Sequence, residues 1–277
     1  MKKILVPCDF TTTALQAFRF ACDIAAKSKG EVFVLNVVEV PHMPNSVFVP
    51  VKGYEADFLK ERKTKVKNHF DKMCAKWGGK VKVSLITDFG SVSSTIYKHI
   101  DKKRIDLVVM GTHGASGVRE FTVGSNTEKI VRQAPVPVIS VHTASKLASI
   151  KHLIFPTRLD LTDTRLVKAV KELQQFCKAT LQVVYVNTPS TFLRDVEVEK
   201  NILQFVAEHQ LKNCNVHIYN DYNEESGIQN FAAKFKGKMI AMGTHGRKGI
   251  NHFMSGSIAE DLVNHIDCPV WTMAVKR

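Results

Sequence analysis

An internal repeat is the feature that most constrains the fold of this 277-residue chain. The segment Gly111-Thr112-His113-Gly114 recurs as Gly243-Thr244-His245-Gly246, at an offset of 132 residues. Lys3–Pro7 resembles His152–Pro156 at an offset of 149, so the second copy is shorter by 17 residues, and we expect the extra residues of the first copy around Pro41–Tyr54. Self-similarity of this kind predicts two tandem domains, residues 1–145 and 146–277.

Within the first copy, segments rich in β-branched residues alternate with segments of helical periodicity. This alternation predicts an α/β fold in which a parallel sheet carries helices on both faces. In such sheets, ligands bind beyond the carboxyl ends of the strands at the topological switch point, which favours the loops after the first and fourth strands. The expected strands are 2–7, 31–38, 80–87, 105–110 and 137–142, and the expected helices are 11–28, 55–77, 91–101 and 124–133.

A glycine-rich loop follows the fourth expected strand of each copy. Glycines allow the backbone to approach a ligand closely, and the amides at a helix N-terminus favour an anion such as phosphate. Ser125-x-x-Glu128 and Ser257-x-x-Glu260 are also capping boxes, so each serine has a structural alternative to a phosphate contact. The loop residues are Gly111, Gly114, Gly124 and Ser125 in the first copy, and Gly243, Gly246, Gly256 and Ser257 in the second.

Asp9 follows the first expected strand and therefore lies at the same edge of the sheet. Its carboxylate suits hydrogen bonds from ribose hydroxyls, and helix capping is the alternative role. His113 and His245 have no acid or nucleophile partner that the sequence identifies, and the histidines lack metal-ligand spacing. We therefore expect no catalytic residue and no metal site.

The chain is basic, with a formal net charge of +13 and a pI near 9.5. This charge is compatible with nucleic acid or with small polyanions such as nucleotides. The densest basic run, residues 60–67, is typical of a solvated helix face, and no aromatic-basic signature accompanies it, so we do not expect nucleic-acid binding.

The six cysteines lack metal-binding spacing, which favours a reducing cytoplasm, with Cys8 and Cys22 as packed thiols. The apolar runs are too short for a membrane span, and we expect no signal peptide.

With these residues, the chain resembles the universal stress protein A family in its tandem, two-domain form. The resemblance covers nearly the whole chain and is carried by the pattern G-x2-G-x9-G-[ST] in both glycine loops and by a first strand that ends in Pro-x-Asp. It implies two Rossmann-like domains of the adenine nucleotide alpha hydrolase-like type, each with a five-stranded parallel sheet of order 3-2-1-4-5. It also implies ATP or a related adenine nucleotide as ligand, and association through the last strand.

Carried over residue by residue, the resemblance implies that Asp9 contacts the ribose and that the backbone of Val37 contacts the adenine. Pro7 would shape the adenine wall, and the glycine loop with Ser125 would hold the phosphates. The second copy departs from this pattern, because Arg158 stands where the first copy has Asp9. Arginine cannot accept a hydrogen bond from ribose, so the second loop with Arg158 is predicted to bind a different anion or nothing.

These features predict a cytoplasmic stress-response protein that binds ATP, with or without Mg²⁺, in the first domain only. Turnover is expected to be weak at most, because the sequence supplies no general base. The alternative is a scaffold that docks partners without binding nucleotide. The apolar segments Val136–Val141 and Val270–Val275 would leave sheet edges open, so we expect the two domains to pack as a pseudo-dimer, and a homodimer of the whole chain is optional.

Overall fold

The computed structural model divides the chain into two compact units, Met1–Gly111 (unit 1) and Thr112–Arg277 (unit 2). It describes residues 1–38, 54–112, 125–245, 258–259, 262–263 and 266–275. Within these ranges, none of the helices combines the length and the apolar character that crossing a membrane would require.

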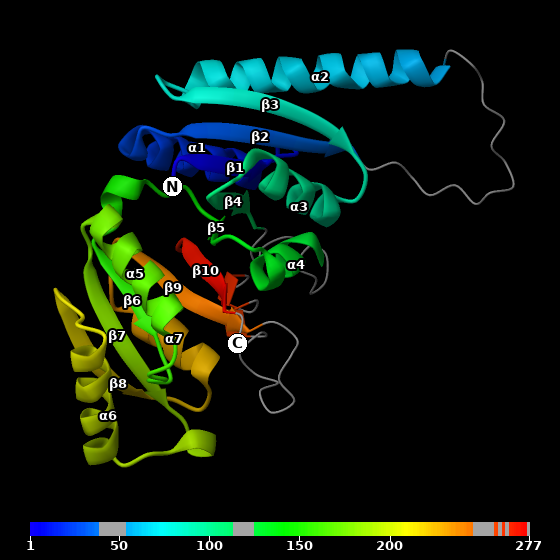
Figure 1. The fold of residues 1–277 in the computed structure, drawn as a ribbon. Coiled ribbons are helices and arrows are strands. Elements are labelled where there is room, and N and C mark those ends of the chain that lie inside the picture. Colours follow the sequence, from blue (N-terminus) through cyan, green and yellow to red (C-terminus); the bar gives the residue numbers. More distant parts are fainter. Residues whose placement is uncertain (39–53, 113–124, 246–257, 260–261, 264–265, 276–277) are drawn as a thin grey trace, which may run out of the picture. The chain divides into compact units, whose positions relative to one another are not determined.

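Unit 1 is a parallel α/β layer (Figure 1). Its four strands follow the order β3-β2-β1-β4, which is the predicted order of 3-2-1-4. Each element starts and ends within two residues of its predicted position. The elements are β1 (Lys3–Pro7), α1 (Thr12–Ser28), β2 (Glu31–Val38), α2 (Tyr54–Trp77), β3 (Lys82–Phe89), α3 (Val92–Lys103) and β4 (Leu107–Gly111).

Burial explains why the central strands of unit 1 read as continuous apolar runs. Ile4, Leu5 and Val6 of β1 are completely buried, as expected for a parallel strand covered on both faces. Right-handed crossovers place α1 and α2 on one face of the sheet and α3 on the other. Consistent with this placement, α1 and α2 contact each other, and the guanidinium of Arg19 lies 5.7 Å from the centroid of the Trp77 ring.

Unit 2 contains the whole second copy together with the last helix and strand of the first. Its strands follow the order β5-β10-β9-β6-β7-β8, and β8-β7-β6-β9-β10 confirms the predicted parallel order of 3-2-1-4-5. The elements are α4 (Ser125–Gln133), β5 (Val138–Val141), η1 (Leu147–Ser149), β6 (His152–Pro156), α5 (Thr164–Cys177), β7 (Thr180–Asn187), η2 (Pro189–Thr191), α6 (Asp195–Glu208), β8 (Cys214–Asn220), α7 (Glu224–Ala233), β9 (Lys238–His245) and β10 (Val270–Val275).

The two apolar segments that the sequence leaves without partners pair with each other inside unit 2. Strand β5 runs antiparallel to β10, with Ile139 opposite Trp271. Both of these side chains are buried. Each strand therefore covers an edge of the other, and this is the one antiparallel pairing among the described strands of the unit.

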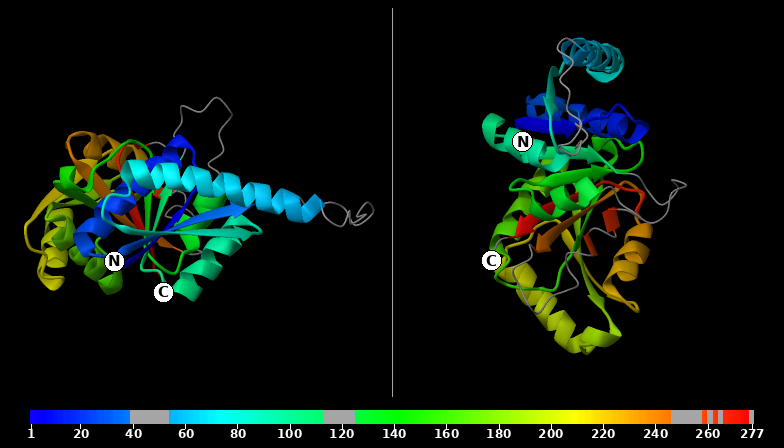
Figure 2. Two further views of the ribbon diagram at one scale, coloured as in Figure 1. Left: turned by 90° about the horizontal axis from the view of Figure 1, so that it is seen from above. Right: turned by 90° about the vertical axis from the view of Figure 1, so that its right-hand side faces the viewer.

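The extra residues of the first copy are divided between a connection and a helix. Residues 39–53 precede α2, whereas only residues 188–194 precede α6. Helix α2 has 24 residues and α6 has 14, so the expectation that the whole difference lies near Pro41–Tyr54 is only partly right. The N-terminal turns of α2 project beyond the end of β3 (Figure 2).

All six cysteines are free thiols, and Cys8 and Cys22 are buried as predicted. Burial raises the pKa of both thiols to about 12. Since the thiolate is the reactive form, neither side chain is suited to redox chemistry in the folded protein.

Candidate functional site

Three of the predicted nucleotide contacts meet at one edge of the unit 1 sheet. Strand β1 lies between β2 and β4, and all three strands are parallel, so their carboxyl ends share an edge. Pro7 ends β1, Val37 lies one residue before the end of β2, and Gly111 ends β4. The chain leaves β1 toward β2 on one side and meets β4 on the other, which makes this edge the topological switch point.

Asp9 projects from the loop between β1 and α1 and is exposed. Its Oδ1 accepts hydrogen bonds from the backbone N–H of Thr11 at 3.0 Å and from the Thr11 hydroxyl at 2.6 Å. The carboxylate therefore closes a turn just before the helix, which is close to the capping alternative. Both hydrogen bonds use Oδ1, which leaves Oδ2 outside this turn.

Gly111 has a packing role that the sequence did not reveal. A Cβ atom at this position would lie 2.5 Å from the carbonyl carbon of Thr13 and 2.7 Å from the backbone nitrogen of Ala14. The first turn of α1 thus passes directly over the glycine, and a larger residue could be accommodated only if the helix backbone moved. This close approach accounts for Gly111 without a ligand.

The other predicted loop residues cannot be placed in the same way. Ser125 begins α4, but its side chain is outside the described part of the structure. Gly114, Gly124, Gly246, Gly256 and Ser257 lie outside the described residues, as does His113.

A charged cluster beside the unit 1 edge was not predicted. Asp88 lies opposite Val37 in the sheet, and its Oδ2 accepts from Nζ of Lys98 at 2.9 Å and pairs with Nε2 of His99 at 2.8 Å. The His99 ring is buried, and its other nitrogen, Nδ1, has no partner in the described part of the chain. Because the three residues lie on two elements, β3 and α3, without motif spacing, the cluster could not be predicted from the sequence.

Replacement of Asp88 by asparagine is expected to destabilise the protein in a pH-dependent way. The hydrogen bond from Lys98, with those from the Phe89 amide and His99, holds the pKa of the Asp88 carboxyl well below its usual range. A lowered pKa means that the stabilisation is complete above the ordinary aspartate pKa, about 4, and is lost as the pH falls through the folded-state value. We expect a cost of about 1–2 kcal/mol between pH 5 and 7 that shrinks below pH 4.

Urea unfolding at several pH values measures this difference. Asp101→Asn is the control, because Asp101 is an exposed carboxylate near the end of α3, the helix that carries Lys98 and His99. A cost for Asp88→Asn that stays constant down to pH 2 would contradict the role assigned to the carboxylate.

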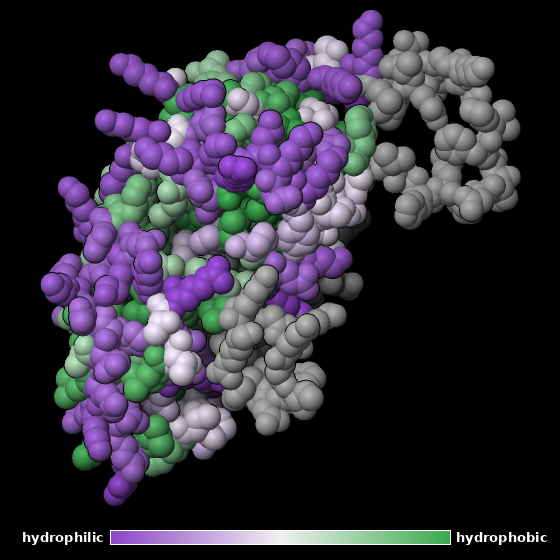
Figure 3. Space-filling model, viewed as in Figure 1, coloured by the Kyte–Doolittle hydropathy of each residue, from purple (hydrophilic) through white to green (hydrophobic). Residues whose placement is uncertain are grey.

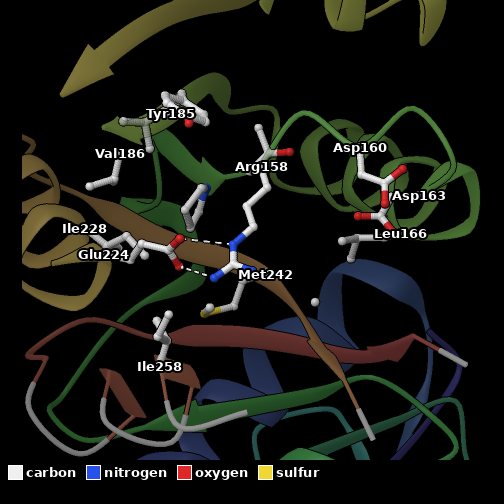
Figure 4. A pocket seen from close by; sticks show the side chains of 14 residues that line it. Arg158, Asp160, Asp163, Leu166, Tyr185, Val186, Glu224, Ile228, Met242 and Ile258 are labelled. Carbon is white, nitrogen blue, oxygen red and sulfur yellow. Dashed lines mark hydrogen bonds and ion pairs between the residues drawn. The ribbon is translucent and has the colours of Figure 1, made fainter. Parts of the chain in front are cut away.

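The second copy holds a cavity of about 310 Å³ at the equivalent edge of unit 2 (Figure 4). It lies at the carboxyl ends of β6, β7 and β9. Its apolar wall repeats the first copy at the offsets of the repeat: Pro156, Val184, Val186 and Met242 correspond to Pro7, Leu35, Val37 and Met110. The remaining lining residues are Thr157, Arg158, Asp160, Asp163, Leu166, Tyr185, Glu224, Ile228, Gly243 and Ile258.

Arg158 forms an ion pair with Glu224, another residue of unit 2. Its Nε and Nη2 donate to the two carboxylate oxygens of Glu224 at 3.0 and 2.9 Å, and Figure 4 shows this two-pronged contact across the cavity. Glu224 is 19% exposed and Arg158 42%. The guanidinium that the sequence assigned to an anion is thus already paired with a carboxylate.

The loop that carries Arg158 keeps the backbone shape of the first copy but moves the turn-forming carboxylate. Phe10 and Leu159 have left-handed φ values of 65° and 63° at matching positions. In the second copy, Asp160 takes the turn role, and its Oδ1 accepts from the N–H and hydroxyl of Thr162. Arg158, which corresponds to Asp9, therefore takes no part in the turn of the second copy.

Glu224 is the site residue that sequence reasoning missed, although a signal for it existed. It begins α7, at the offset of 132 from Val92, which begins α3. Alignment of the two copies at this offset shows Glu224 in place of Val92. Together with Arg158 in place of Asp9, this gives two replacements of opposite charge, which is the signal for an ion pair. Gly243 also differs from Gly111, because the atoms nearest to an added Cβ belong to the side chains of Leu166 and Val275 and not to a backbone.

The fold and the two candidate sites define a class: a tandem α/β protein in which each copy has a topological switch point at the carboxyl ends of strands ordered 3-2-1-4. The chain belongs to the universal stress protein family, whose model matches residues 1–142 and again residues 149–273.

Individual relatives agree with this assignment. A universal stress protein of Methanocaldococcus jannaschii is 32% identical over 148 residues, which cover 52% of this chain and 84% of the relative. The crystal structure of a universal stress protein from Archaeoglobus fulgidus is similar over 98% of both chains, with a TM-score of 0.74 and 17% identity. A functionally unknown Pseudomonas aeruginosa protein is similar over 99% of this chain and 92% of its own, with a TM-score of 0.65 and 17% identity. At these identities, the two structures establish the shared fold alone.

Proposed function

We propose that this chain is a cytoplasmic stress-response protein that binds an adenine nucleotide, ATP above all, at the unit 1 edge. The observation that carries the proposal is the arrangement of Pro7, Asp9 and Val37 around the carboxyl end of β1, at the switch point of a parallel sheet and beside β4, which leads into the glycine loop. An adenine against the apolar end of β2 would place its ribose near the carboxylate of Asp9. The phosphates would then extend toward the glycine loop after β4.

The proposed activity is binding with little or no turnover. Asp9 is the one carboxylate among the three residues at this edge, and the described residues contain no cluster of three or more metal-ligating side chains. Magnesium would therefore arrive with the nucleotide, held by the phosphates and water. Nucleotide binding would act on partners through its different affinity for two states of the protein.

Calorimetric titration of Mg-ATP into the full chain tests the proposal. The wild-type chain is expected to bind, and Gly124→Val/Ser125→Val is expected to weaken binding more than about tenfold, because valine side chains block the approach of a phosphate to the loop. The matched control is Gly256→Val/Ser257→Val, the same change at the equivalent positions of the second copy. It should leave the affinity unchanged.

Two outcomes would overturn the proposal. The first is a folded wild-type chain that binds no adenine nucleotide. The second is equal loss of binding in the two valine variants, which would contradict the restriction to the first copy. Thermal unfolding of each variant establishes that the chain is folded.

A partner-docking function is the second candidate, favoured by exposed apolar residues in unit 2. Phe192, Val196 and Leu203 are 67%, 77% and 61% exposed, and Val196 and Leu203 lie two turns apart on α6. Hydrophobic patches appear among hydrophilic side chains in the region of α6 in Figure 3. Single exposed apolar residues are common on protein surfaces, so this observation is weaker than the unit 1 edge.

A further inference from the structure

The cavity of the second copy keeps the apolar lining residues of the first copy but has a different charged residue at the position of Asp9. Four apolar lining residues match the first copy position by position, and a cavity of about 310 Å³ remains. Several of the other lining positions differ between the copies, and two of the replacements bring in opposite charges: Arg158 stands in place of Asp9, and Glu224 in place of Val92. The two new side chains bind each other, so the exchange is a matched pair of replacements.

We propose that the Arg158–Glu224 ion pair is a latch that closes the second copy to adenine nucleotides, and that these two residues decide which copy of the repeat binds. The inference rests on the proposed nucleotide function of the first copy. It extends that function by assigning the difference between the copies to one contact.

The chemistry of the pair explains why a nucleotide would be rejected. A guanidinium has five N–H donors and no acceptor, so it cannot replace Asp9 as the acceptor for ribose hydroxyls. Two of its N–H groups, on Nε and Nη2, donate to Glu224 in a bidentate contact, which is a strong geometry for an ion pair.

A phosphate could use the Arg158 charge only by displacing Glu224. That carboxylate is 19% exposed, and displacement would leave it mostly buried beside an added anion, which is costly. Glu224 is also the first residue of α7, where the helix dipole stabilises a carboxylate. The cavity therefore already contains an anion of its own where the first copy has an apolar valine.

Exchange of the two residues between the copies tests the latch. Arg158→Asp/Glu224→Val gives the second copy the residues of the first and is expected to add one Mg-ATP site to the full chain in calorimetric titration. The reciprocal variant, Asp9→Arg/Val92→Glu, gives the first copy the residues of the second and is expected to weaken its binding more than about tenfold. Thermal unfolding verifies that each variant is folded.

The double change Arg158→Ala/Glu224→Val is the control, because it removes the pair without supplying a ribose acceptor and without leaving a free guanidinium for a phosphate. It is expected to leave the stoichiometry of the wild type. The latch is refuted if a folded Arg158→Asp/Glu224→Val chain binds no more Mg-ATP than the wild type, or if the wild type already fills two sites. Should the exchanged chain fail to fold, the reciprocal variant decides, and unchanged binding by a folded Asp9→Arg/Val92→Glu chain refutes the latch.

Failure of the proposed function has a separate signature. A wild-type chain without any Mg-ATP binding refutes the unit 1 site. The latch is then judged by the exchanged variant alone, which must still gain one site over the wild type.

Discussion

A fragment of residues 112–277 is expected to unfold cooperatively, whereas a fragment of residues 146–277 is expected to lose about 5 kcal/mol or more of stability or to aggregate. The shorter fragment starts at the boundary that the repeat predicts, and it lacks α4 and β5. In the structure these two elements contact β9 and β10 inside unit 2.

The expected magnitude follows from what the shorter fragment lacks. Ile130, Val131, Val138, Ile139 and Val141 are at most 2% exposed, and burial of each such side chain contributes roughly 1.5–3 kcal/mol. A whole domain is stable by only about 5–15 kcal/mol. Loss of β5 also leaves the edge of β10 open, which invites pairing with another chain.

Urea unfolding and size-exclusion chromatography of the two purified fragments measure the difference. Equal stability and equal solubility would show that α4 and β5 contribute little to unit 2. The boundary at residue 145 would then describe the folding unit as well as the repeat.

Gly111→Ala is expected to destabilise the protein by about 3 kcal/mol, whereas Gly243→Ala is expected to cost about 1 kcal/mol or less. The two glycines occupy the same motif position in the two copies. At Gly111 the new methyl group would meet the backbone of α1, which can give way only if the helix moves. At Gly243 the nearest atoms are Cδ2 of Leu166 at 2.8 Å and Cγ2 of Val275 at 3.1 Å, and both side chains can change rotamer.

Urea unfolding of both variants measures the two costs. Because one substitution is compared at two equivalent positions, the conformational effect of alanine on the unfolded chain largely cancels. Equal costs would contradict the packing role of Gly111. A large cost at Gly111 means that lost ligand binding in that variant is no evidence for a ligand contact.

The sequence predicted the elements of the fold well, because parallel strands covered on both faces leave continuous apolar runs. The sequence also marked the segments around Ile139 and Trp271 as open sheet edges, and in the structure these two segments pair with each other. The distribution of the extra residues was harder to predict. A longer α2 and a longer connection before it change the offset between the copies in the same way, so the offset does not distinguish them. Helical periodicity located α2 but did not identify its extra length as part of the insertion.

For the candidate sites, the sequence predicted where some residues lie in the fold but not which side chains contact each other. The strand ends placed Pro7, Val37 and Gly111 at one edge, because this follows from topology alone. Arg158 lies in the loop after β6, and its partner is 66 residues further along the chain at the start of α7, so the pair depends on tertiary structure. For the same reason, the contact of Gly111 with the first turn of α1 was hidden in the sequence.

The pairing of β5 with β10 also has a consequence during protein synthesis, because the two strands leave the ribosome at different times. Strand β5 ends at Val141, and its partner begins at Val270, close to the end of the chain. A ribosome that adds about 5–20 residues per second needs roughly 6–26 s to make the intervening segment. During that interval β5 has no β10 to pair with, so its apolar side chains and its open edge are accessible to aggregation or to a chaperone.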